Sequence, residues 1–73
     1  MDVSRGRCQI NSLLKGIGMR PSELARRTGI KRQRIWDYAN DIVKMSPETM
    51  YVVSRAIGCH SEDLYEWLIG KAE

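Results

Sequence analysis

The sequence has little of what disulfide scaffolds and metal sites require. Its two cysteines, Cys8 and Cys59, are too few for a disulfide framework, and an intracellular chain would keep them reduced. The single histidine, His60, directly follows Cys59, and this pair with the distant Cys8 lacks both the spacing and the fourth ligand of a zinc site. We therefore expect two buried or half-buried thiols, no metal and no cofactor.

Catalytic constellations are also missing. A nucleophile needs a base within reach, and the only histidine adjoins Cys59 in the chain, which does not by itself make a dyad. The sequence has no glycine-rich phosphate loop and no carboxylate pair set in a plausible pocket, and 73 residues with one small core leave little room for a cleft. We predict that the chain is not an enzyme and takes no small-molecule ligand.

Long hydrophobic runs are absent. No apolar stretch approaches the ~18–20 residues that a membrane span requires. The first twelve residues, MDVSRGRCQINS, lack the apolar core of a secretory signal. A hydrophobic fraction of 42% with 29% charged residues argues against disorder. We therefore expect a globular protein that works in the cytoplasm.

Positive charge is concentrated in one part of the chain. Residues 1–45 hold ten Lys and Arg against four Asp and Glu, a net +6, whereas residues 46–73 hold two against five, a net −3; together they give the overall +3. This asymmetry is typical of a protein with one phosphate-facing side. A merely solubilising surface remains the alternative on charge alone.

Apolar residues recur at helical spacing along most of the chain, and no strand pattern, internal repeat or low-complexity stretch is evident. We predict an all-α fold, a compact bundle of five short helices in a single domain over residues 1–73. Residues 1–6 are expected to form a loose arm. Arg5 and Arg7 either trail onto a phosphate backbone or, like many frayed basic ends, contact nothing. In the last helix we expect Leu64, Trp67 and Leu68 to face inward. The predicted helices span about residues 7–16, 21–28, 32–39, 47–57 and 61–68.

Residues 21–39 have the pattern of a helix-turn-helix. Pro21 suits the first position of a helix, although Arg20 is a weak cap before it. Gly29 can take the positive φ that ends this helix and turns the chain. In the second helix, at 100° per residue, Ile35 and Tyr38 fall on one side. The opposite, polar side carries Arg32, Gln33, Trp36, Asp37 and Asn40.

That polar side has the chemistry of a helix that contacts bases in the major groove. Arg pairs with guanine O6 and N7, and Gln with adenine N6 and N7. Trp36 either packs on thymine methyls or sugars, or stacks under Arg32, or is partly core in a rotated helix. Asp37 either accepts from cytosine N4 or orients Arg34. For the cations Arg20, Lys31, Arg34 and Lys44 we predict phosphate contacts, the alternative being ordinary solvated side chains.

The stretch MRPSELARRTGIKRQRIWDYAN, followed by SPETM and AIGC, resembles the Cro and phage-repressor (Xre-type) helix-turn-helix family over roughly residues 8–68. The resemblance implies a five-helix bundle that binds operator DNA, usually as a two-fold dimer. By position, Arg32 and Gln33 match the residues that most often contact bases, Trp36 and Asp37 match further groove-facing positions, and Asn40 matches a residue that commonly contacts phosphate. The chain departs from the family at two positions. Pro21 stands where a phosphate-contacting Gln is common, and Asp41 stands where Gly is usual, which is expected to shift the exit from helix 32–39.

The leading hypothesis is a sequence-specific double-stranded DNA-binding transcriptional regulator, a repressor, acting as a homodimer in the cytoplasm of a bacterial cell or phage-infected host. Tyr65, Trp67 and Leu68 form either its dimer surface or part of its core. The alternative is a helix-turn-helix module that acts mainly by protein–protein contact, as an antitoxin-like or anti-repressor partner. Steep weakening of binding with salt would distinguish the first from the second.

Overall fold

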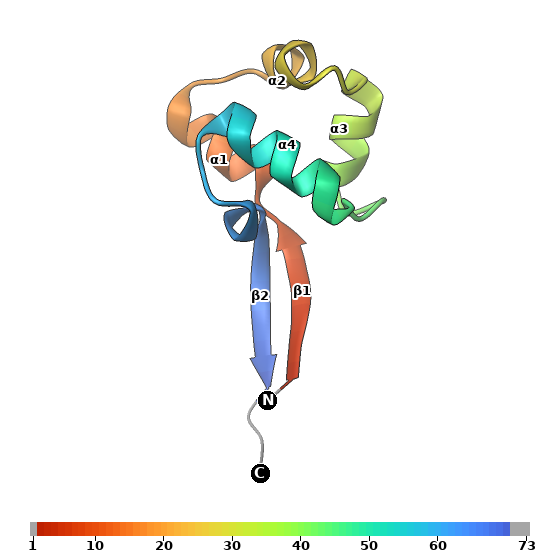
Figure 1. The fold of residues 1–73 in the computed structure, drawn as a ribbon, viewed down its shortest axis with the longest axis vertical. Coiled ribbons are helices and arrows are strands. Elements are labelled where there is room, and N and C mark those ends of the chain that lie inside the picture. The colour runs from red at the N-terminus through yellow and green to blue at the C-terminus, as the bar shows by residue number, and fades with distance from the viewer. Residues whose placement is uncertain (1, 71–73) are drawn as a thin grey trace.

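A computed structural model describes residues 2–70; residue 1 of the predicted arm and residues 71–73 of the predicted domain lie outside the described residues. Four helices gather into a bundle, and two strands form a ribbon that projects from it (Figure 1). The molecule measures 45 × 22 × 19 Å along its principal axes. In chain order the elements are β1 (Asp2–Cys8), α1 (Ile10–Ile17), α2 (Pro21–Thr28), α3 (Arg32–Ala39), α4 (Pro47–Ile57), the 3₁₀ turn η1 (Ser61–Leu64) and β2 (Tyr65–Gly70).

The predicted bounds of α2, α3 and α4 are confirmed, because strong local signals fix them. Proline at the first position of α2 loses no hydrogen bond, and Gly29, with φ 75°, donates its N–H to the carbonyl of Ala25 and closes the helix. Ser46 caps α4 by accepting from the N–H of Thr49 at 3.2 Å. Arg20 makes no side-chain cap, as expected of that residue type.

One core joins the bundle to the base of the ribbon. Leu24 of α2 and Ile35 of α3 are at most 1% exposed, and burying two such side chains holds the two helices of the helix-turn-helix against each other. Tyr65, the first residue of β2, is also buried, so the ribbon begins inside the core. The buried hydrophobic residues are Cys8, Ile10, Leu14, Leu24, Ile35, Tyr38, Met45, Val53, Leu64 and Tyr65.

The prediction of an all-α bundle of five helices was wrong. β1 and β2 form a two-stranded antiparallel sheet, so the predicted loose arm is a strand. The predicted helix over residues 61–68 is replaced by η1 and most of β2. The predicted first helix begins at Ile10 rather than near Arg7, because the preceding residues belong to β1.

Pairing with β1 holds residues 65–70 in an extended strand. Val3 lies opposite Ile69, Ser4 opposite Leu68, and Arg5 opposite Trp67, with an irregularity in β1 between Arg5 and Cys8. Alternating residues of a strand share a face, so Tyr65, Trp67 and Ile69 line one side of β2. This pairing joins the two ends of the described chain. The spacing of apolar residues within one segment cannot reveal a contact between segments so far apart in the sequence.

The side chains of the predicted last helix lie differently from the prediction. Leu64 is buried as expected, but Trp67 and Leu68 are 39% and 51% exposed. Tyr65 is buried, which agrees with the alternative that places it in the core. None of the helices in residues 2–70 is long and apolar enough to cross a membrane.

Candidate nucleic-acid interface

Helix α3 presents one face to the core and the opposite face to solvent. Ile35 and Tyr38 are buried, whereas Arg32, Gln33 and Trp36 are exposed. Trp36 is 54% exposed and lies neither in the core nor among the partly buried residues packed against it, so the alternative of a rotated helix with Trp36 partly in the core is wrong. A large indole held outward, away from the core that its own helix helps to build, is available for contact with another molecule.

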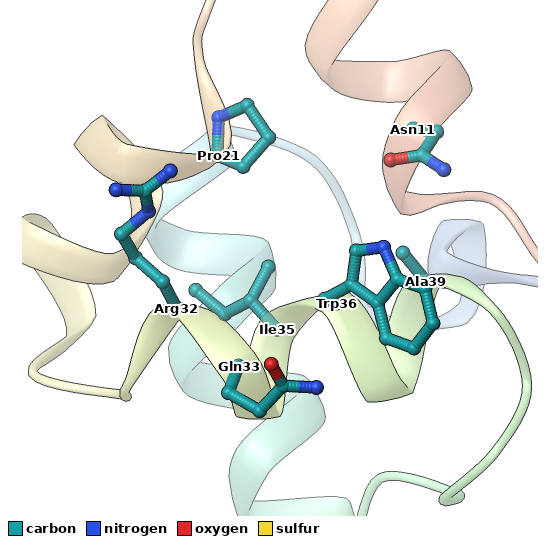
Figure 2. Close-up of a pocket in the computed structure, with 7 residues that line it drawn as sticks. All are labelled: Asn11, Pro21, Arg32, Gln33, Ile35, Trp36 and Ala39. Carbon is teal, nitrogen blue, oxygen red and sulfur yellow. The ribbon is translucent and has the colours of Figure 1, made fainter.

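A hollow of about 480 Å³ lies beside this outward face (Figure 2). Pro21, at the start of α2, and Arg32, at the start of α3, lie at one side of it, and the indole of Trp36 lies near Ala39. Arg32, Gln33 and Trp36, all predicted from the sequence as base contacts, are therefore brought to one concave site. The lining residues are Asn11, Pro21, Arg32, Gln33, Ile35, Trp36 and Ala39.

Two polar side chains of α3 are tied to each other one helical turn apart. Gln33 Nε2 donates to Asp37 Oδ1 at 3.1 Å, so the half-buried carboxylate of Asp37 is engaged by Gln33 and not by Arg34. The side-chain oxygen of Gln33 stays free to accept. At the end of the helix, Asn40 Nδ2 donates to the carbonyl of Trp36 at 2.9 Å, which satisfies a terminal carbonyl.

The predicted phosphate contacts are all exposed, and they flank the helix-turn-helix at several points. Arg20 stands at the N-cap of α2, Lys31 at the N-cap of α3, and Lys44 in the loop after α3. Arg34 and Asn40 complete the predicted set. Within residues 2–70 the ion pair found is Arg27 with Glu23 along α2, so it engages none of these four cations.

Arg5 does not trail away from the fold. Its guanidinium Nη1 donates to the carbonyl of Met45 at 2.8 Å and lies over the ring of Tyr65, 5.1 Å from the ring centroid. The expectation that Arg5 belongs to a loose arm was therefore wrong. Because its charge is engaged at the base of the ribbon, it contributes to the fold.

The loop that follows α3 is fixed by the base of the ribbon. Asp41 has φ 61°, the left-handed conformation for which glycine is usual, and its Oδ1 accepts from the N–H of Cys8 at 3.0 Å. The N–H of Met45 donates to the hydroxyl of Tyr65 at 3.0 Å. The side chain of Asp41, which glycine would lack, thus links the end of α3 to β1. The exposed Lys44 lies in a loop that hydrogen bonds hold at both ends.

The pKa values of both cysteine thiols are raised. Desolvation by burial raises the pKa of the Cys8 thiol and, with the nearby carboxylate of Asp63, that of the Cys59 thiol. Both thiols therefore stay protonated near neutral pH, which disfavours nucleophilic attack or metal ligation. Burial also raises the pKa of Tyr65. No group of three His, Cys, Asp or Glu side chains placed to hold a metal occurs in the part of the chain that the structure describes.

Sequence reasoning missed two features of this surface. Asn11 of α1 lines the hollow, but nothing in the sequence shows which side of α1 approaches α3. The tether from Asp41 to Cys8 also escaped prediction, although the unusual residue after Asn40 was a signal that the helix exit is special.

Comparison with known proteins finds one family and one relative that the chain resembles. The family described as the Cro/C1-type HTH DNA-binding domain matches residues 9–68. The chain is also similar to YopS of Bacillus subtilis (strain 168), an SPbeta prophage-derived uncharacterized HTH-type transcriptional regulator. The two are 39% identical over 69 residues, covering 92% of each chain. No solved structure matches the chain.

Proposed function

Because the chain belongs to the Cro/C1-type HTH DNA-binding domain family, we propose that it is a sequence-specific, double-stranded DNA-binding transcriptional regulator. We further propose that it acts as a repressor, in the cytoplasm of a bacterial cell or phage-infected host, and that it has no catalytic activity. The observation that carries the proposal is the outward face of α3, where Arg32, Gln33 and Trp36 border one hollow at the exposed side of the helix-turn-helix.

In this proposal α3 enters the major groove and Arg32 and Gln33 contact base edges. Arg32 pairs with guanine O6 and N7, and each such bidentate contact contributes about 1–3 kcal/mol of discrimination against the wrong base. Gln33 contacts adenine, and its hydrogen bond to Asp37 fixes the direction of its amide. The preorganised amide loses less side-chain freedom on binding.

Trp36 and Asp37 extend the same face. The exposed indole offers an apolar surface to thymine methyl groups, and the carboxylate of Asp37 accepts from cytosine N4. A carboxylate near phosphates is repelled by them, and in this proposal the hydrogen bond from Gln33 to Asp37 persists in the complex and offsets part of that cost.

Arg20, Lys31, Arg34 and Lys44, together with Asn40, contact phosphates. Pro21 cannot make the side-chain phosphate contact of the Gln that is common at this position, so Arg20 just before it takes that place. Four cations per chain predict a log–log salt slope of about −3.6 and roughly a 100-fold weaker affinity between about 50 and 200 mM salt. A homodimer that binds two half-sites about one helical turn apart doubles this slope.

A selection of bound sequences from random duplexes, followed by two alanine variants, tests the proposal. Arg32→Ala should flatten the preference at one position of each half-site, whereas Lys44→Ala should weaken all sequences alike. Arg55→Ala, on the exposed part of α4, is the matched control and should leave binding unchanged, since its guanidinium lies over the Tyr51 ring 5.8 Å from the centroid. If Arg32→Ala and Lys44→Ala behave identically across operator variants, this assignment of roles is wrong.

A second candidate is a module that acts mainly through protein contact. It is favoured by exposed apolar side chains outside α3: Ile42 in the loop and Tyr51 and Val52 of α4 are 60%, 61% and 42% exposed. A largely apolar contact would barely change between low and moderate salt. A chain that retains no duplex at low salt but captures a protein would favour this candidate.

A further inference from the structure

A stripe of exposed side chains runs along α4 on the side away from the core. Four residues at positions i, i+3, i+4 and i+7 of this helix share one face, and we call them the α4 stripe: Glu48, Tyr51, Val52 and Arg55. Tyr51 and Val52 are 61% and 42% exposed, whereas the neighbouring Val53 is fully buried. Adjacent exposed apolar side chains of this kind are typical of a surface that contacts another protein.

The α4 stripe carries opposite charges at its two ends. Glu48 lies in the first turn of α4 and Arg55 in the last turn. Within residues 2–70 neither takes part in an ion pair, since the pair found there joins Arg27 to Glu23. The guanidinium of Arg55 lies over the ring of Tyr51, 5.8 Å from the centroid, which holds the charge beside the apolar centre. Along the helix the stripe is therefore acidic, then apolar, then basic.

We propose that the α4 stripe packs antiparallel against the α4 stripe of a second copy of this chain, about a two-fold axis. The axis passes between Tyr51 and Val52, which is also the midpoint between Glu48 and Arg55. In this register each Glu48 lies opposite Arg55 of the other copy, and each Tyr51 lies opposite Val52 of the other copy. The two ion pairs are about 10 Å apart along the helix, with the apolar pairs between them.

A second copy suits this surface because the stripe is complementary to itself. A parallel arrangement in register would place Glu48 against Glu48 and Arg55 against Arg55, and like charges in contact disfavour it. The antiparallel arrangement pairs every charge with its opposite and also sets the two helix dipoles in opposite directions. Because the same patch is used on both copies, the contact closes after two chains.

The α4 stripe is accessible while the other surfaces of the chain are in use. Among the described residues, none of α4 lines the hollow beside α3. Val53 of α4 and Ile35 of α3 belong to the same core, so α4 packs on the core side of α3. The ribbon projects from the bundle and its far end lies away from α4 (Figure 1). The contact can therefore join two chains, or two homodimers, that are each bound to DNA.

The small size of the α4 stripe makes the contact weak. Stable interfaces use roughly 20–30 residues from each partner, and the stripe supplies four. A weak contact matters when chains are held close together, because proteins at neighbouring sites on one duplex meet at an effective concentration of about 1 mM. We expect occupation of one operator to favour occupation of its neighbour, a consequence that rests on the proposed function. The pairing itself does not require DNA.

Charge reversal tests the pairing without DNA. Sedimentation equilibrium of the full chain at low salt, up to about 1 mM, should show a self-association step. Glu48→Arg and Arg55→Glu should each raise its dissociation constant by about tenfold or more, because two attractive pairs become repulsive. An equimolar mixture of the two variants should restore the association, since every Arg then faces a Glu. The double variant with both reversals should restore it as well.

Two reversals outside α4 are matched controls. Lys15→Glu lies in the last turn of α1, as Arg55 does in α4, and Glu62→Arg lies in the first turn of η1. Each changes the net charge as its counterpart does and should alter the constant by less than about threefold. Circular dichroism checks that all variants fold. A chain that stays monomeric to about 1 mM, an association that neither α4 reversal weakens, or a mixture that does not restore it overturns the proposal. So does capture of a different protein through Tyr51 without self-association.

A duplex carrying two selected operators tests the consequence for DNA. With the operators separated by whole helical turns of about 10.5 base pairs, the parent chain should fill the second site about threefold or more tightly than the first. This ratio should fall to about one for Glu48→Arg and for Arg55→Glu and return in the double variant. A ratio near one for the parent chain at every spacing contradicts the consequence. Charge-dependent association by a chain that binds no duplex refutes the proposed function and leaves the α4 pairing standing.

Discussion

Asp41 offers a sharp test of how the end of α3 is held, because one side chain meets two demands. Its backbone has φ 61°, which costs most residues about 1–2 kcal/mol and costs glycine little. Its carboxylate accepts the N–H of Cys8, a residue only 6% exposed, so removal leaves a buried donor without this partner. Such a loss costs about 1–3 kcal/mol.

Three substitutions separate the two contributions. Asp41→Ala loses the acceptor and puts in the left-handed conformation a residue that tolerates it less well than Asp does, so we expect about 2–4 kcal/mol of lost stability. Asp41→Gly relieves the backbone but still lacks the acceptor, and we expect a loss of about 1–2 kcal/mol. Asp41→Asn keeps an acceptor oxygen and tolerates the left-handed region, so we expect a change below about 1 kcal/mol.

Urea unfolding monitored by circular dichroism measures these differences, with the slope of each transition checked for constancy. The expected order of stability is parent chain, Asn, Gly, then Ala. If Asp41→Ala is as stable as the parent chain, neither the strain nor the hydrogen bond matters. If Asp41→Asn is as damaging as Asp41→Ala, the carboxylate charge, and not the hydrogen-bond geometry, holds the loop.

Three further outcomes follow from the structure. Tyr65→Phe should cost about 1–3 kcal/mol in urea unfolding, because the buried N–H of Met45 loses its acceptor. Ser46→Ala should cost about 1 kcal/mol by removing the cap on the N–H of Thr49, whereas Ser46→Asp should preserve stability. Folding raises the pKa values of Cys8 and Tyr65, so their stabilising contribution is complete at neutral pH and is lost as the pH rises above about 8.5. Unfolding free energies measured from about pH 7 to 10.5 should fall, and less so for Cys8→Ala; a flat profile would contradict this assignment.

The helix-turn-helix was predictable because its signals are local. Pro21 and Gly29 mark the ends of α2, and Ser46 marks the start of α4. Helical periodicity then predicted that Ile35 faces the core and Arg32 faces solvent. In a regular helix of eight residues, the positions of the apolar side chains determine which face is buried.

The ribbon was not predictable in the same way. Leu64, Trp67 and Leu68 have helical spacing, yet Tyr65, Trp67 and Ile69 equally fit a strand, and short apolar runs do not distinguish the two. The choice is made by pairing with β1 at the other end of the described chain. The same non-local contacts place Arg5 on Tyr65 and were invisible to a reading of neighbouring residues.

In the candidate site, too, some features were predictable from the sequence and others depend on packing. Which residues of α3 face outward followed from its period, but the bond between Gln33 and Asp37 depends on side-chain conformations that spacing does not determine. The participation of Asn11 depends on how α1 packs beside α3. Periodicity therefore predicted which side chains of α3 are exposed, and packing determined the shape of the hollow beside them.

Methylation interference on the selected duplex tests most directly whether the outward face of α3 contacts base edges in the major groove. Methyl groups at guanine N7 should block binding of the parent chain at two clusters about 10–10.5 base pairs apart. For Arg32→Ala, one of the interfering guanines in each cluster should become neutral. Tight binding that ignores guanine N7 in every cluster, or an interference pattern that Arg32→Ala leaves unchanged, would contradict the account.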